Sequence, residues 1–78
     1  MNNIAPVILF VYNRPDHTIK TLSALENNIL ADQTTLYIYS DAAKNEKSVP
    51  AVTEVRKIIN KSWNFKEVII VERTENWG

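Results

Sequence analysis

The sequence predicts an α/β fold, a Rossmann-like half-sheet with the order β-α-β-α-β and three parallel strands. Two observations lead to this prediction. Three short runs of aliphatic, β-branched and aromatic residues alternate with longer stretches in which apolar residues recur at helical spacing. Such alternation is typical of parallel strands joined by right-handed crossovers, as in one half of a doubly wound sheet.

The first strand is expected over residues 5–12, a continuous apolar run of the kind buried on both faces of a parallel sheet. The first helix is expected from Pro15 to Asn28, because proline suits the first helical position and Asp16 in the first turn complements the helix dipole. The residues predicted to form its apolar face are Ile19, Leu22, Leu25 and Ile29. Asn27 and Asn28 are expected to end it.

The second strand is expected at Thr35–Ser40, whose residues are mostly β-branched or aromatic. A polar connection with an exposed turn follows, and the second helix begins at Ser48-Val49-Pro50. The residues predicted for its apolar side are Val52, Val55, Ile58 and Ile59. A third buried strand is expected at Val68–Val71, with Trp63 and Phe65 closing the core before it.

The composition limits the classes of protein that are compatible with the chain. Its 78 residues make a single small domain, and 45% apolar residues indicate a folded protein. The absence of cysteine excludes disulfides and zinc-thiolate sites. Nine Lys and Arg balance nine Asp and Glu, which argues against a broad nucleic-acid-binding surface. No run approaches the roughly 20 apolar residues of a membrane helix, and no signal peptide is recognisable, so we expect a cytoplasmic protein.

Polar residues follow each predicted strand where it ends. In parallel sheets ligands bind beyond the carboxyl ends of the strands, and three segments meet that edge here: Tyr12-Asn13-Arg14, Ser40-Asp41 and residues 72–78. The helix that starts at Pro15 offers unpaired N–H groups and a positive dipole end to an anion. The Arg14 guanidinium has the fork geometry suited to phosphate. The sequence therefore predicts a phosphate or nucleotide site at this edge.

Three segments resemble the N-terminal nucleotide-binding part of GT-A fold glycosyltransferases, the group that includes glycosyltransferase family 2. They are residues 6–15, Tyr39-Ser-Asp41 and Glu75-Asn-Trp-Gly78. The resemblance covers essentially the whole chain and about the first third of such an enzyme. It implies that the chain is the N-terminal portion of a larger enzyme. That enzyme would transfer a sugar from a nucleoside diphosphate sugar to an acceptor hydroxyl, and a UDP-sugar is the first candidate for the donor.

The resemblance also implies roles for particular residues. Tyr12 and Asn13 would lie along the base and ribose, and Arg14 would reach the diphosphate. Asp41 would accept a hydrogen bond from the uracil ring. Asn76 and Gly78 would border the nucleotide pocket.

In such enzymes Mg²⁺ or Mn²⁺ neutralises the leaving diphosphate. The metal-binding Asp-x-Asp segment and the catalytic base lie downstream of the part that this chain resembles. The chain alone is therefore expected to be inactive and to bind no metal tightly. The sequence also departs from the family at two places, because Ala42-Ala43 replaces a common Gly-Ser and Phe10 stands where many members have proline.

Other interpretations remain open for the same residues. Asp41 is also suited to cap a turn through its own backbone hydrogen bonds, and Arg14 to be a surface charge. The tyrosines Tyr12, Tyr37 and Tyr39 suit packing roles, and of these only Tyr12 is retained as a candidate ligand contact. The alternative function is a non-catalytic α/β interaction or regulatory module. A homodimer, formed through an uncovered sheet edge or through Trp77, is a further alternative.

Overall fold

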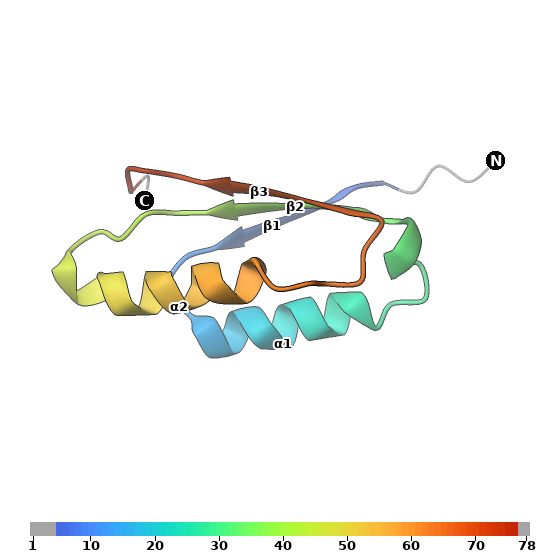
Figure 1. Cartoon of the computed structure of the whole chain (residues 1–78), viewed down its shortest axis with the longest axis horizontal. Helices are drawn as coiled ribbons and strands as arrows, with labels where there is room; N and C mark the ends of the chain where they lie inside the picture. Colours follow the sequence, from blue (N-terminus) through green and yellow to red (C-terminus); the bar gives the residue numbers. More distant parts are fainter. Residues whose placement is uncertain (1–4, 77–78) are drawn as a thin grey trace.

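The structure, a computed structural model, describes residues 5–76, in which three strands alternate with two α-helices (Figure 1). The elements are β1 (Val7–Val11), α1 (Pro15–Glu26), η1 (Ala31–Gln33), β2 (Thr35–Ser40), η2 (Glu46–Ser48), α2 (Val49–Ile59) and β3 (Glu67–Glu72). The strands form one parallel sheet in the order β1-β2-β3. The predicted α/β half-sheet is confirmed.

The register of the sheet places the ends of all three strands together. Val11 at the end of β1 pairs with Ser40 at the end of β2, and Ser40 pairs with Glu72 at the end of β3. Two backbone hydrogen bonds continue the pairing beyond the strands, from Asp41 N–H to the Val11 carbonyl (3.1 Å) and from Arg73 N–H to the Ser40 carbonyl (2.9 Å). The three polar segments therefore all leave the sheet at the carboxyl ends of its strands, as predicted.

The hydrophobic core lies between the sheet and the two helices, which cover the same face of the sheet (Figure 1). Alternation along β2 directs Leu36 and Ile38 toward the helices, and both are fully buried. The residues predicted for the apolar side of α2 are all buried: Val52, Val55, Ile58 and Ile59. Trp63 and Phe65 pack against this core as expected, so the interior is largely the one that the sequence predicted.

The first helix begins as predicted but ends earlier. Pro15 occupies its first turn and Asn27 is its C-cap. The next residue starts a turn instead of another helical step, because the Asn28 side chain accepts a hydrogen bond from the Leu30 N–H (3.0 Å). The expectation for Ile29 was therefore wrong, since this side chain is 90% exposed and lies outside the helix.

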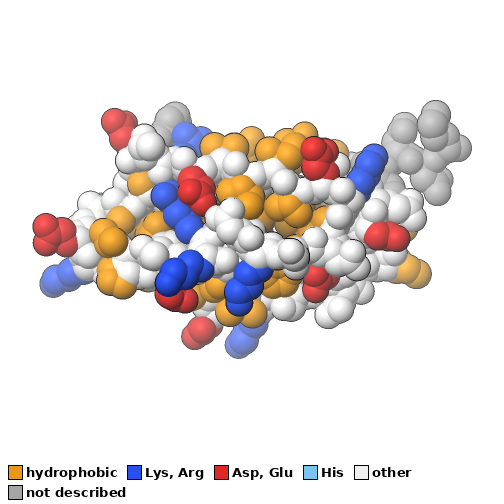
Figure 2. Space-filling model, in the orientation of Figure 1, with side chains coloured by type: hydrophobic (Ala, Val, Ile, Leu, Met, Phe, Trp, Pro, Cys, Tyr) orange, Lys and Arg blue, Asp and Glu red, His pale blue; other side chains and the backbone are white. Residues whose placement is uncertain are grey.

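The expectation of strands buried on both faces was also wrong within the described residues. Ile8 and Phe10 of β1 are 56% and 74% exposed, and Val71 of β3 is 39% exposed. Both helices cover one face, so side chains of the opposite parity remain uncovered. Figure 2 shows hydrophobic side chains along the upper edge of the view, where the sheet lies in Figure 1. We call this the open face, formed by Ile8, Phe10, Tyr37, Tyr39, Ile69 and Val71.

Candidate functional site

A cavity of about 600 Å³ lies at the carboxyl ends of the strands. It is lined by residues from the segments that directly follow β1, β2 and β3, which we call the strand exits. Its polar lining includes Tyr12, Asn13, Arg14, His17, Asp41 and Arg73. Four of these were singled out from the sequence, and the structure brings them to one pocket. The volume falls within the roughly 300–1,000 Å³ that is usual for small-molecule sites.

The exit of β1 combines an arginine with a helix N-terminus. Arg14 is the N-cap residue of α1, is exposed, and lines the cavity. Its carbonyl accepts hydrogen bonds from the Thr18 N–H (2.9 Å) and the Thr18 hydroxyl (2.8 Å), and its side chain does not cap the helix. The positive end of the helix dipole and Arg14 therefore lie at the same wall of the cavity, an arrangement that favours an anion.

Tyr12 connects the first strand exit to the loop that follows β2. Its hydroxyl accepts a hydrogen bond from the Lys44 N–H (3.1 Å). The ring is half-buried and lines the cavity. Tyr12 therefore makes a structural contact that sequence reasoning had left open, and it also forms part of the cavity wall.

The exit of β2 is organised by the Asp41 carboxylate. One oxygen, Oδ1, accepts a hydrogen bond from the Ala42 N–H (2.9 Å), as expected for a turn-capping aspartate. The other, Oδ2, accepts one from the Asn76 side-chain amide (3.3 Å). The same amide donates to the Ala42 carbonyl (2.9 Å). Asp41 is therefore half-buried, fixed in orientation and part of the cavity wall.

Asn76 and Gly78 were predicted to border the pocket. Asn76 is not one of the residues that line the cavity, but it contacts the lining residue Asp41 and its neighbour Ala42 through the two hydrogen bonds described above, so the segments after β2 and β3 are joined. Gly78 lies outside the described residues, as does Trp77, which was named above as a candidate dimer surface.

Sequence reasoning missed two features of the lining. Arg73 follows β3 directly, and a cation within the segment 72–78 was the available signal. Phe10 and Tyr39 stack on the open face with ring centroids 5.4 Å apart and an interplanar angle of 23°, and both line the cavity. The register that pairs Phe10 with Tyr39 follows only from the sheet itself, which explains why this pair was not predicted.

The charges of the lining suit an anion better than a cation. The lining includes two arginines, Arg14 and Arg73, and one aspartate, Asp41. Mg²⁺ and Mn²⁺ prefer several oxygen ligands, and a single carboxylate beside two arginines does not fit them. Within residues 5–76 no group of three or more His, Cys, Asp or Glu side chains is placed to hold a metal ion.

Comparisons with known proteins add no further assignment. No protein-family model, curated protein or solved structure matches this chain. Neither of the described α-helices is long and apolar enough to cross a membrane.

Proposed function

We propose that this chain binds the nucleotide part of a nucleoside diphosphate sugar, with UDP-sugars as the first candidates. It would form the N-terminal portion of a GT-A type glycosyltransferase, which transfers the sugar to an acceptor hydroxyl. The observation that carries the proposal is the convergence of Arg14, the N-terminus of α1 and Asp41 on one cavity of about 600 Å³. No catalytic base or metal ligand is assigned to the chain, so the proposal concerns binding.

The diphosphate is placed at the Arg14 wall of the cavity. Its charge is complementary to the guanidinium and to the positive end of α1. Arg73 adds a second cation to the same cavity. An anion gains more from this arrangement than a neutral ligand does, which supports a phosphorylated ligand.

The base is placed at Asp41. The N3–H of uracil is a hydrogen-bond donor, whereas N3 of cytosine is an acceptor that a carboxylate repels. The Asp41 carboxylate is held by Ala42 and Asn76, so its oxygens have a fixed position in the cavity wall. UDP is therefore favoured over CDP.

The test is a titration of the isotopically labelled chain with UDP, CDP and GDP, followed through its backbone amide NMR signals. UDP without added Mg²⁺ is the probe, because no step of the proposed binding involves a metal. We expect shifts concentrated at residues 12–14, 41–44 and 73–76, and the tightest binding for UDP. Shifts of equal size for all three nucleotides, or none at these residues, would contradict the proposal.

Asp41→Asn tests the assignment of the base. Asparagine keeps the size of the side chain but presents a donor as well as an acceptor, so we expect the preference for UDP over CDP to fall by about ten-fold. Asp32→Asn is the matched control, because Asp32 is an exposed residue of η1 that does not line the cavity. An unchanged UDP/CDP ratio in the Asp41 variant would overturn the assignment.

The open face favours a second candidate function, a non-catalytic module that pairs with another copy of itself. The exposed side chains of Ile8, Phe10 and Val71 are apolar, and parallel sheets are usually covered on both faces. Strands about 4.8 Å apart with a rise of about 3.3 Å per residue give a face of a few hundred Å². A standard stable interface buries about 800 Å² per partner, so we expect only weak self-association.

Sedimentation over a range of protein concentrations tests this candidate. We expect the average mass to rise only above roughly 100 μM, as suits an interface of this small area. A chain that stays monomeric at about 1 mM, where even a weak dimer is populated, would remove the candidate.

A further inference from the structure

One arginine outside the cavity lining joins α2 to the exits of β2 and β3. The Arg56 Nε donates a hydrogen bond to the Ser40 hydroxyl (3.0 Å). Its Nη2 is within hydrogen-bond distance of three backbone carbonyls, those of Ser40 (3.3 Å), Asp41 (3.3 Å) and Arg73 (2.7 Å). We call these four contacts the Arg56 clamp.

The helical position of Arg56 explains why it reaches this edge. It lies four residues after Val52 and three before Ile59, and therefore on the buried stripe of α2. The alternation of β2 turns Ser40 toward the same side, where it is fully buried. The guanidinium is half-buried against neutral oxygens, and its planar set of donors matches acceptors from two neighbouring strand exits.

The acceptors of the clamp connect it to the cavity. Two of the three carbonyls belong to Asp41 and Arg73, and both of these residues line the cavity. The Ser40 carbonyl also accepts a hydrogen bond from the Arg73 N–H (2.9 Å). One acceptor of the clamp therefore also takes part in the backbone hydrogen bond that joins the β2 and β3 exits. Fixing these peptide groups fixes the points from which the Asp41 carboxylate and the Arg73 guanidinium extend.

We propose that Arg56 is the positioning residue of this cavity, which sets Asp41 relative to Arg73 and thereby the preference among bases. The inference rests on the proposed function for the identity of the ligand. Arg56 acts through the backbone and does not contact the nucleotide. Lysine keeps the charge at this position but lacks the planar fork that holds several acceptors at once.

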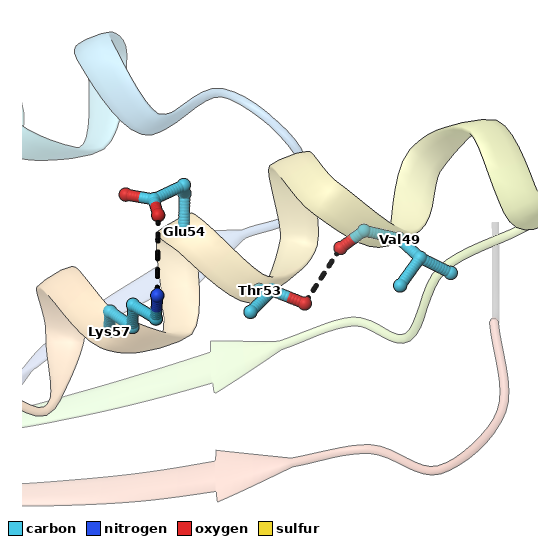
Figure 3. Close-up of polar contacts among 4 residues, drawn as sticks. All are labelled: Val49, Thr53, Glu54 and Lys57. Atoms are coloured by element: carbon cyan, nitrogen blue, oxygen red, sulfur yellow. Dashed lines mark hydrogen bonds and ion pairs between the residues drawn. The ribbon is translucent and has the colours of Figure 1, made fainter.

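The test compares Arg56→Met and Arg56→Lys with two controls. Val55→Ala removes a fully buried neighbour and lowers stability without touching the clamp. Lys57→Met removes the next cation of α2, which forms an exposed ion pair with Glu54 (Nζ to Oε1, 3.6 Å; Figure 3). All four variants are measured with UDP and CDP at a temperature where each is folded.

We expect Arg56→Met to reduce the UDP/CDP affinity ratio by about ten-fold, since charge-assisted hydrogen bonds hold the clamp. Arg56→Lys should lie between this variant and the wild type. Both controls should keep the wild-type ratio, including Val55→Ala despite its lower stability. An unchanged ratio in Arg56→Met, or an equal fall in Val55→Ala, overturns the inference.

Amide hydrogen exchange in the ligand-free chain separates this inference from the proposed function. Relative to the global unfolding of each variant, the Asp41 and Arg73 amides should exchange about ten-fold faster in Arg56→Met than in Val55→Ala. If the wild type binds no nucleotide, the proposed function fails, and this measurement still decides whether the clamp orders the two exits. Equal exchange in both variants refutes the clamp whatever the ligand.

Discussion

Removal of the Arg14 charge should weaken the binding of UDP but not that of uridine. Arg14→Met keeps most of the side-chain length and removes the guanidinium from the wall of the cavity. Arg14 is exposed, so water and salt screen its charge, and the contribution falls below that of a buried pair. Exposed pairs contribute about 0.2–1 kcal/mol and hydrogen bonds to charged groups about 1.5–3 kcal/mol.

For a cation at the mouth of a cavity we take an intermediate value of about 1–2 kcal/mol, which corresponds to an increase of about 5- to 30-fold in the Kd for UDP. Uridine has no phosphate, so its Kd should change by less than about two-fold, within the spread of surface substitutions. The difference between the two ligands isolates the contact between Arg14 and the phosphates from any general damage to the fold.

The assay is a calorimetric or NMR titration of the wild type and of Arg14→Met with UDP and with uridine. Each titration is made at about 50 mM and about 300 mM salt, where screening lengths differ more than two-fold. The UDP effect should shrink at the higher salt concentration. Lys20→Met, which removes an exposed cation of α1 outside the cavity lining, is the control. Equal losses for UDP and uridine, or a Lys20 variant as weak as the Arg14 variant, would refute a diphosphate at this wall.

Two further predictions concern the scaffold. Leu36→Ala empties a fully buried site on the central strand and should lower the free energy of unfolding by about 2–5 kcal/mol in urea titrations, whereas Ile8→Ala on the open face should cost less than about 1 kcal/mol. Equal losses would mean that the open face is covered in solution. Tyr12→Phe removes the acceptor of the Lys44 N–H and should lower stability by about 0.5–1 kcal/mol, with amide shifts centred on Lys44; shifts confined to β1 would contradict that contact.

The elements that were predicted well carry their own local signals. Thr35–Ser40 was placed with the observed bounds because a run of β-branched and aromatic residues has few alternatives to a strand. The apolar side of α2 followed from spacing alone. The end of α1 was misplaced by two residues, because the hydrogen bond of the Asn28 side chain competes with continued helix. The spacing of apolar residues carries no information about such a hydrogen bond.

The predictions that failed or were not made depend on tertiary arrangement. A continuous apolar run is the same for a strand buried on both faces and for one with a bare face, so the exposure of Phe10 was not recognisable. Arg56 offered a signal that was overlooked, namely a cation at helical spacing between Val52 and Ile59 on a buried stripe. Its partners were not predictable, since they lie on backbone carbonyls of two other segments.

The backbone of the chain explains why side chains must organise this site. Phosphate-binding loops commonly rely on glycine and on positive φ angles, which turn successive N–H groups toward the anion. The single glycine of the sequence is Gly78, and no residue in the described part of the chain has a positive φ angle. A backbone cradle of that type is therefore absent from residues 5–76. An anion bound there, as we propose, would be held by Arg14, Arg73 and the start of α1, and the hydrogen bonds of Arg56 connect the two strand exits that carry Asp41 and Arg73.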